Sequence, residues 1–156
     1  MNGGATMWDR VKFRRPGSFF FCAGGGLGFG IPGAVGAQLA QPDRPVVALT
    51  GDGGAQYGIQ GLYTASRYGV PVTIIVLDNG EYGILKGFGE FLSADQVPGL
   101  DIDGLDYESL ARGYGVEAVT AGTLTELESA LTHAFEDRSQ PHLVVVPIEP
   151  GVALGG

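Results

Sequence analysis

Two polar motifs follow two apolar runs of the sequence, and both contain residue types that bind phosphates or divalent cations. The run 45–50 leads into Gly-Asp-Gly-Gly (51–54), and the run 71–77 leads into Asp-Asn-Gly-Glu (78–81). Glycines let backbone N–H groups approach a diphosphate at the start of a helix, where the helix dipole favours the anion. An aspartate in the same motif would repel the diphosphate unless a divalent cation lay between them. The motifs therefore predict a diphosphate bound through Mg²⁺, with Ca²⁺ as the alternative.

Asp52 and Asn79 are the residues that we expect to bind this cation. Each lies just past the end of its own apolar run, and in open parallel sheets ligands bind beyond the C-terminal ends of the strands. A hard octahedral cation accepts an amide oxygen beside a carboxylate, phosphate oxygens and water. Either residue alone could be a plain turn residue, because Asp-Gly and Asn-Gly are favoured where φ is positive. Their occurrence after adjacent apolar runs favours the cation site.

A parallel sheet is needed to bring the two motifs together, and the sequence predicts one. Nearly continuous apolar runs are typical of strands buried on both faces, and we expect such strands at residues 18–23, 45–50, 71–77, 116–120 and 142–148. Helical patterns occur at residues 31–39, 55–68, 107–114 and 124–137. This alternation predicts an α/β fold with three layers, a parallel sheet flanked by helices.

Three further segments complete the expected architecture. Thr123 and Glu126 have the spacing of a capping box, which marks the start of the last helix. The stretch 87–105 is polar and contains glycine, and we expect a long loop there that borders a site. The tail 150–156 is expected to be loose.

Length and composition predict one domain over residues 1–156 with a single core, since the chain has 156 residues and 44% are hydrophobic. The net charge of -8 argues against nucleic acid or an anionic membrane as the partner. One cysteine, Cys22, excludes a disulfide within one chain. Residues 1–15 contain no signal-peptide core, and no apolar run is long enough for a membrane span, so we expect a cytoplasmic domain.

The motif Gly-Asp-Gly (51–53) together with Asn79 is similar to the signature of thiamine-diphosphate enzymes, which pairs GDG with two consecutive asparagines. Further matching motifs extend over nearly the whole chain and resemble the 2-oxo-acid decarboxylases of the benzoylformate decarboxylase type; they are Met7-Trp8, residues 16–18, 25–29, 97–101 and 113–116. The resemblance implies the thiamine-diphosphate-binding fold. It also implies that Asp52, Asn79 and the main-chain carbonyl of Glu81 bind the metal. Asp78 stands where the first asparagine is usual, but this is not a ligand position.

The same resemblance assigns residues to the cofactor and to the substrate. It implies that Leu27 packs between the two rings of thiamine diphosphate and holds the cofactor bent, and that the Gly25 carbonyl accepts from the cofactor's amino group. The residues implied to line the diphosphate are Gly53, Gly54 and Tyr82, and those implied to line the substrate pocket are Ile84, Leu85, Phe88 and Leu100. Benzoylformate decarboxylase has alanine at the place matching Ile84, so the larger side chain predicts a narrower pocket than an aryl substrate needs.

The resemblance also implies that this chain holds no catalytic residue. Members of the family take an activating glutamate from a pyrimidine-binding domain, in the same polypeptide or a partner subunit, and no segment here resembles that domain. Neither His133 nor His142 matches the histidines that move protons in the family. We therefore expect this chain to be part of a larger homo-oligomeric enzyme acting on a small 2-oxo acid, and to be inactive alone.

Other interpretations remain open at this point. An acetolactate-synthase-like carboligase would use the same cofactor site. A non-catalytic nucleotide- or cofactor-binding module is suggested by G-x-G-x-x-G at residues 28–33, with Asp52 at the distance of a Rossmann ribose-binding acid. As single apolar residues, Phe88 and Leu100 could be ordinary core, and Lys86 is interpreted as a solvated charge.

Overall fold

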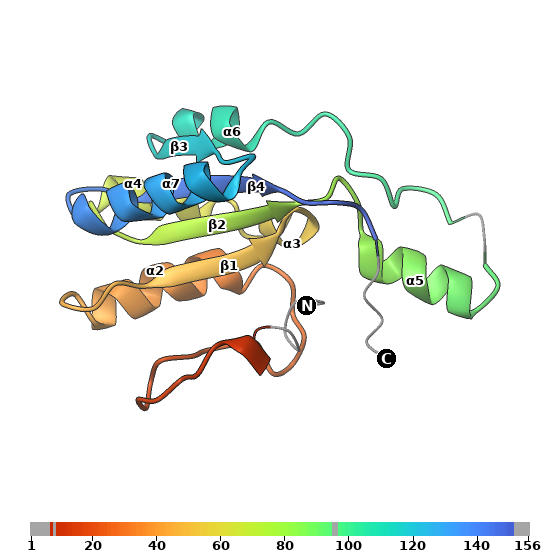
Figure 1. The fold of residues 1–156 in the computed structure, drawn as a ribbon, viewed down its shortest axis with the longest axis horizontal. Helices are drawn as coiled ribbons and strands as arrows, with labels where there is room; N and C mark the ends of the chain where they lie inside the picture. Colours follow the sequence, from red (N-terminus) through yellow and green to blue (C-terminus); the bar gives the residue numbers. More distant parts are fainter. Residues whose placement is uncertain (1–6, 8, 95–96, 152–156) are drawn as a thin grey trace.

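Four parallel strands form the sheet of the computed structural model, which describes residues 7, 9–94 and 97–151 (Figure 1). The strands are β1 (Val47–Gly51), β2 (Thr73–Asp78), β3 (Glu117–Thr120) and β4 (His142–Pro147). They lie in the order β1-β2-β4-β3, and every neighbouring pair is parallel. The predicted α/β fold with a parallel sheet is confirmed, because the four strands alternate with helices along the chain.

Six helices surround the sheet in the described part of the chain. They are α2 (Gly30–Ala40), α3 (Asp52–Gln56), α4 (Gly61–Arg67), α5 (Gly83–Phe91), α6 (Tyr107–Gly113) and α7 (Leu124–Glu136). The predicted capping box is present at the start of α7, where the Thr123 side chain accepts from the Glu126 N–H. Asp106 caps α6 by accepting from the Ser109 N–H at 2.9 Å. None of the helices in the described residues has the length and apolar surface needed to span a bilayer.

The helices cover both faces of the sheet, which gives the predicted three layers. On one face, residues of α2, α4 and α6 join alternate strand residues in one buried core; its members include Ile31, Leu62, Ala111, Ile74, Val76, Leu143 and Val145. Side chains alternate between the faces along a strand, so Val144 points to the opposite face. There α7 packs against β4, and Ala130 lies beside Val144. Helix α5 extends past the C-terminal ends of the strands (Figure 1).

The predicted strand at residues 18–23 is wrong. These residues have irregular backbone outside the sheet, and the Phe20 and Phe21 side chains are 66% and 52% exposed. The ring of Phe19 contacts those of Phe13 and Phe21 instead, with centroids 4.7 and 5.9 Å apart. An apolar run indicates a surface that favours burial, but it does not specify backbone pairing with a strand.

Two helix predictions also need correction. The predicted helix at 55–68 is interrupted by turns at 57–60, where the backbone of Gly58 packs closely against Gly28; a Cβ at Gly58 would lie 2.4 Å from the Gly28 carbonyl oxygen. The expected loop at 87–105 begins as the end of α5, because glycines at 87 and 89 masked the helical spacing of the apolar residues around them. The tail prediction falls mainly on residues 152–156, which lie outside the described residues.

Candidate functional site

Asp52 connects the C-terminal ends of the neighbouring strands β1 and β2. Gly51 pairs with Leu77 in the register of β1 and β2, so the residues that follow both strands meet at one edge of the sheet. Asp52 is the first residue of α3 and is only 3% exposed. Its Oδ1 accepts from the Gly53 N–H at 2.8 Å, and its Oδ2 accepts from the Gly80 N–H at 2.8 Å. The carboxylate is therefore held in a fixed orientation by backbone donors from both strand ends.

Asn79 and the main chain of Glu81 complete a cluster around this carboxylate. With its nitrogen turned towards them, the Asn79 amide donates to Oδ1 of Asp52 at 3.2 Å and to the Glu81 carbonyl oxygen at 2.9 Å. If the amide is turned so that its oxygen faces the same two groups, the Asn79 oxygen lies 3.2 Å from Oδ1 of Asp52 and 2.9 Å from the Glu81 carbonyl oxygen. An octahedral Mg²⁺ with bonds of about 2.0–2.1 Å separates neighbouring ligand oxygens by about 3 Å. The three groups therefore have the chemistry and the spacing of a magnesium ligand set, although their role as ligands stays a prediction.

The electrostatics of the cluster also favour a cation. Burial raises the pKa of Asp52 above its ordinary value, and the Asp78 carboxylate beside it adds to this rise, while the N–H groups of Gly53 and Gly80 act against it. A buried carboxylate with a second acid close by is costly to ionise. A bound divalent ion reverses this cost, because it is the largest charge in such a site.

Lys86 holds the loop that presents the Glu81 carbonyl, and its interpretation as a solvated charge is wrong. Its Nζ forms ion pairs with Oε2 of Glu81 (2.5 Å) and Oδ1 of Asp101 (2.6 Å). These two carboxylates, that of Asp101 first, raise the pKa of Lys86. Glu81 and Asp101 also form an antiparallel bridge, flanked by a hydrogen bond from the Tyr82 N–H to the Leu100 carbonyl oxygen at 2.8 Å. Sequence reasoning missed this lysine because the partner Asp101 is distant in sequence.

The residues predicted to line the diphosphate lie at the same edge. Gly53 packs so closely on Tyr82 that a Cβ there would lie 2.5 Å from the tyrosine ring. Gly54 lies against Thr50, whose Oγ1 would be 3.0 Å from a Cβ at position 54. Burial also raises the pKa of Tyr82, as do the neighbouring Tyr57 and Asp52. Gly53 is buried and Gly54 is half-buried, so the absence of a side chain at position 53 is what allows the close packing of Tyr82.

Gly25 and Leu27, the other predicted cofactor residues, lie in the turn that leads into α2. Gly25 has a positive φ of 68°, and the Leu27 side chain is 59% exposed. Gly30, the first residue of α2, packs on Thr50 near the end of β1. The structure therefore places the turn beside the Asp52 edge of the sheet, with Leu27 available to a ligand.

The predicted substrate residues are only partly brought together. Ile84, Leu85 and Phe88 share α5, where Ile84 is half-buried and the side chains of Leu85 and Phe88 are 47% and 51% exposed. Leu100 lines a hollow of about 290 Å³ together with Lys86. Among the described residues, the lining of this hollow does not include Ile84, Leu85 or Phe88.

The glycine pattern at 28–33 has a packing explanation. No strand precedes it among the described residues, so the arrangement of a Rossmann phosphate turn is not present. Gly28 has a φ of 88°, and a Cβ there would lie 2.5 Å from the Tyr57 carbonyl oxygen. This glycine is needed for close contact between two backbone segments.

Comparisons with known proteins show which family this chain resembles in sequence and fold. A family model described as thiamine pyrophosphate enzyme, C-terminal TPP binding domain, matches residues 2–146. A benzoylformate decarboxylase of Pseudomonas aeruginosa is 55% identical over 148 residues, which are 93% of this chain and 28% of that protein. An acetolactate synthase large subunit of Haemophilus influenzae is 40% identical over 125 residues, 80% of this chain and 22% of that protein. The chain thus spans about a quarter of the length of these relatives.

Two solved structures have the same fold. A thiamine diphosphate-dependent 4-hydroxybenzoylformate decarboxylase of Rhodococcus jostii superposes with a TM-score of 0.91 at 44% identity, covering 95% of this chain and 28% of that one. A benzoylformate decarboxylase of Polynucleobacter necessarius also gives 0.91, at 37% identity, covering 97% and 29%. With the family match over residues 2–146, these similarities show that the chain belongs to the C-terminal, thiamine-pyrophosphate-binding domain family of thiamine pyrophosphate enzymes.

Proposed function

We propose that this chain holds thiamine diphosphate and Mg²⁺ for a non-oxidative 2-oxo-acid decarboxylase, which releases CO₂ and an aldehyde. The observation that carries the proposal is the convergence of Asp52, Asn79 and the Glu81 carbonyl at one edge of the sheet. A 55% identical relative and two structural neighbours are benzoylformate or hydroxybenzoylformate decarboxylases, and this similarity supports decarboxylation as the reaction.

The residues of the chain position the reactants in this proposal. Asp52, Asn79 and the Glu81 carbonyl would hold Mg²⁺, which would supply the positive charge that the diphosphate needs beside Asp52. Gly53, Gly54 and Tyr82 line the diphosphate, and the Leu27 side chain and the Gly25 carbonyl orient the rings. When bound, thiamine diphosphate supplies the electron sink that decarboxylation requires.

The apolar face of α5 is proposed as one wall of the substrate pocket. Ile84, Leu85 and Phe88 lie on this helix, and Leu100 lies on the segment that pairs with its start. Apolar walls exclude water from the reacting carboxylate, which favours loss of CO₂. The branched Ile84 side chain narrows the pocket, so a small 2-oxo acid is proposed as substrate.

The rest of the active site is proposed to come from a pyrimidine-binding domain, in the same polypeptide or in a partner subunit. No catalytic residue is assigned within this chain. Large apolar side chains are exposed on α5 and in the N-terminal segment; they include Phe20, Phe21, Leu85, Phe88, Phe91 and Leu92. Exposed apolar surface of this kind favours association, so we propose a homo-oligomer, acting in the cytoplasm.

Calorimetric titration of thiamine diphosphate into the chain tests the cofactor assignment. Binding is expected with Mg²⁺ and is expected to be lost with a chelator. Equal binding under both conditions would contradict the metal-bridged site.

Product analysis then tests the reaction. The complete enzyme, supplied with a panel of 2-oxo acids, is expected to release aldehyde, whereas this chain alone is expected to release none.

Carboligation is the second candidate, because an acetolactate synthase large subunit is 40% identical to this chain. It uses the same metal and diphosphate contacts, so cofactor titration does not separate the two reactions. The products separate them. If the complete enzyme releases a 2-hydroxy-3-oxo acid, formed from two substrate molecules, in place of an aldehyde, the proposed reaction becomes carboligation. Metal-independent nucleotide binding would instead support a non-catalytic binding module.

A further inference from the structure

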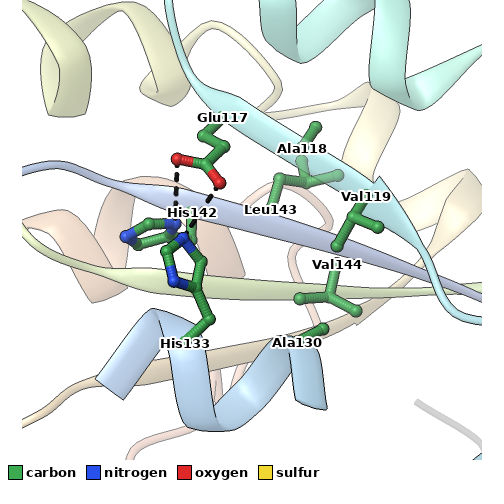
Figure 2. Close-up of a pocket in the computed structure, with 8 residues that line it drawn as sticks. All are labelled: Glu117, Ala118, Val119, Ala130, His133, His142, Leu143 and Val144. Atoms are coloured by element: carbon green, nitrogen blue, oxygen red, sulfur yellow. Dashed lines mark hydrogen bonds and ion pairs between the residues drawn. The ribbon is translucent and has the colours of Figure 1, made fainter. Parts of the chain in front are cut away.

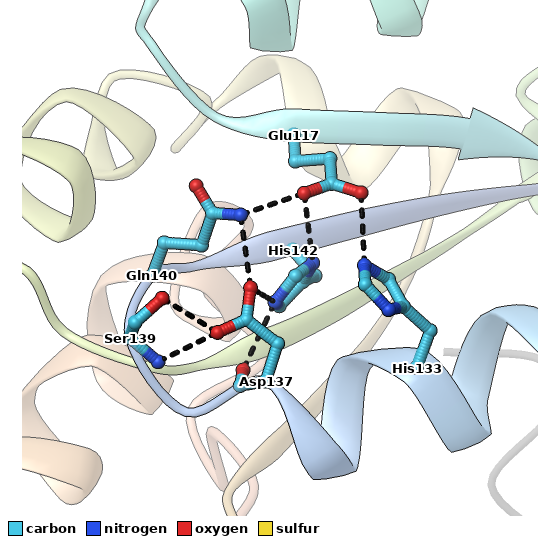
Figure 3. A network of polar contacts seen from close by, with 6 residues as sticks. All are labelled: Glu117, His133, Asp137, Ser139, Gln140 and His142. Atoms are coloured by element: carbon cyan, nitrogen blue, oxygen red, sulfur yellow. Dashed lines mark hydrogen bonds and ion pairs between the residues drawn. The ribbon is translucent and has the colours of Figure 1, made fainter.

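A second cluster of metal-ligating side chains lies at the opposite end of the sheet from Asp52. Glu117 and His142 are the first residues of β3 and β4 and pair in register, while His133 and Asp137 belong to α7 and its C-cap (Figure 3). One potential ligand atom from each of the four residues lies within 4.8 Å of those of the other three. The N-terminal ends of two strands and the end of a helix therefore bring together two imidazoles and two carboxylates.

We propose that Glu117, His133 and His142 bind one divalent ion of the zinc class, with water in the remaining position. The chain contains two histidines, and both lie in this cluster. Two imidazoles and one carboxylate hold zinc in known three-ligand sites, and imidazole suits zinc better than it suits Mg²⁺. This donor set therefore differs in kind from the all-oxygen set at Asp52.

The hydrogen bonds of His142 fix which of its nitrogens is free to bind a metal. Its Nε2 lies 3.0 Å from the main-chain carbonyl oxygen of Asp137, which can only accept, so Nε2 carries the proton. In the neutral ring, Nδ1 is then the unprotonated nitrogen, and it faces Oε2 of Glu117 at 3.8 Å, beyond hydrogen-bond distance. Because the His142 side chain is only 4% exposed, its lone pair has a fixed direction. Two acceptors that face each other in this way favour a cation between them.

The carboxylates of the cluster are held by surrounding donors. The Gln140 side chain donates to Oε2 of Glu117 at 2.6 Å and to Oδ2 of Asp137 at 3.0 Å. Ser139 donates to Asp137 through its N–H and its hydroxyl, and these bonds, with the one from Gln140, lower the pKa of Asp137 to about 2. Outer partners of this kind orient metal-binding histidines and carboxylates in known sites. We therefore assign Asp137 to orienting the His142 ring, through its main-chain carbonyl oxygen, and not to binding the ion.

His133 approaches the cluster from the solvent side. Its Nε2 lies 3.0 Å from Oε1 of Glu117, and its ring lies edge-on to that of His142, with centroids 5.2 Å apart. Its side chain is 57% exposed, which leaves a route for an ion to enter. A cavity of about 20 Å³ opens beside the three proposed ligands, walled by the apolar side chains of Ala118, Val119, Ala130, Leu143 and Val144 (Figure 2). A space of this size admits about one water.

An ion bound by Glu117, His133 and His142 would link the edge strand β3 to β4 and to helix α7. Anything that binds the folded chain and not the unfolded one raises its stability by mass action. The site would therefore stabilise the edge of the sheet, independently of cofactor binding at the Asp52 edge. The competing explanation is a network of ion pairs and hydrogen bonds that binds no metal.

Zinc titration of the full chain without an affinity tag, with Mg²⁺ in excess to occupy the Asp52 site, tests the proposal. The readout is the NMR spectrum of the imidazole nitrogens, which reports on this cluster alone because no other histidine is present. The expected result is one zinc per chain, with both imidazoles shifted and a higher thermal unfolding midpoint. Unshifted imidazole signals in the folded chain at saturating zinc would overturn the proposal.

Matched variants separate ligation from general effects of charge. The exposed His133→Gln is expected to lower zinc affinity by more than about tenfold, and Gln140→Leu, which removes an outer partner, by about 10–100-fold. Glu117→Gln removes the charge of the proposed carboxylate ligand and is expected to lower zinc affinity. Glu128→Gln removes a carboxylate charge from the exposed face of α7 and is expected to leave zinc affinity unchanged. If His133→Gln binds zinc as tightly as the unaltered chain while remaining folded by circular dichroism, the ligand assignment fails.

Discussion

The side-chain amide of Asn79 lies 3.2 Å from Oδ1 of Asp52, although the two residues follow different strands. The parallel pairing of β1 with β2 produces this contact, since it aligns the C-terminal ends of the strands. The backbone N–H of Gly80 donates to the same aspartate at 2.8 Å and fixes its orientation. The fold therefore brings the proposed metal ligands together at one edge of the sheet.

Asp52→Asn is expected to lower the affinity for thiamine diphosphate in the presence of Mg²⁺ by more than about tenfold, because changes to outer partners alone cost 10–100-fold. Calorimetric titration measures the loss. Asp103→Asn is the matched control, since it removes an exposed carboxylate from the loop that follows Asp101. An Asp52→Asn variant that binds as tightly as this control would exclude Asp52 as a ligand.

Gly53→Ala is expected to destabilise the chain by about 1–3 kcal/mol, because the added methyl group overlaps the Tyr82 ring and approaches Ile102. Gly36→Ala places the same methyl group in the exposed interior of α2, where no atom lies within 4 Å. That control is expected to stabilise by about 0.5–1 kcal/mol. Urea unfolding measures both, and equal effects of the two substitutions would refute the close packing.

Lys86→Met is expected to weaken Mg²⁺-dependent cofactor binding by about tenfold without removing a ligand, since Lys86 orients the loop that carries the Glu81 carbonyl. Lys12→Gln removes the other lysine of the chain, at an exposed position, and controls for the lost charge. Titration calorimetry compares the two variants. Unchanged affinity in Lys86→Met would show that the loop keeps its shape without the ion pairs.

The N-cap of α6 predicts a dependence of stability on pH. Hydrogen bonds from the Ser109 hydroxyl and N–H lower the pKa of Asp106 below 3.8 in the folded chain. The ionised carboxylate therefore stabilises the fold fully above the unfolded value of 3.8, and this contribution is lost as pH falls through the folded pKa.

Asp106→Asn keeps a capping side chain but removes the charge. The difference in the free energy of unfolding between the unaltered chain and this variant is expected to be larger at about pH 7 than at about pH 3. Urea titrations at both values measure it. A difference that stays constant with pH would contradict the lowered pKa.

The parts of the fold that sequence predicted well are those in which neighbouring residues determine structure. β2 and β4 are buried on both faces, so their apolar runs had the pattern of parallel strands, and the capping box marked the start of α7. The run 18–23 was equally apolar, but no partner strand lies beside it in the described part of the chain. Pairing is a property of the whole fold, which the run itself does not encode.

The same distinction applies to the two sites. The proximity of Asp52 and Asn79 could be predicted from sequence because the ends of parallel strands meet at one edge, a general property of this architecture. The contact between Glu117 and His142 depends on the register of β3 against β4, and that of His133 on the path of α7. No local pattern of residues indicates either feature, so this cluster emerged only from the structure.

The most direct test of the central claim is a crystal structure of the chain with thiamine diphosphate and Mn²⁺ in place of Mg²⁺, with the ion located by its anomalous scattering. We expect one peak within coordination distance of Oδ1 of Asp52, the Glu81 carbonyl oxygen and the Asn79 amide, with the amide turned so that its oxygen faces the ion. A bound diphosphate with no peak between these three groups would contradict the account.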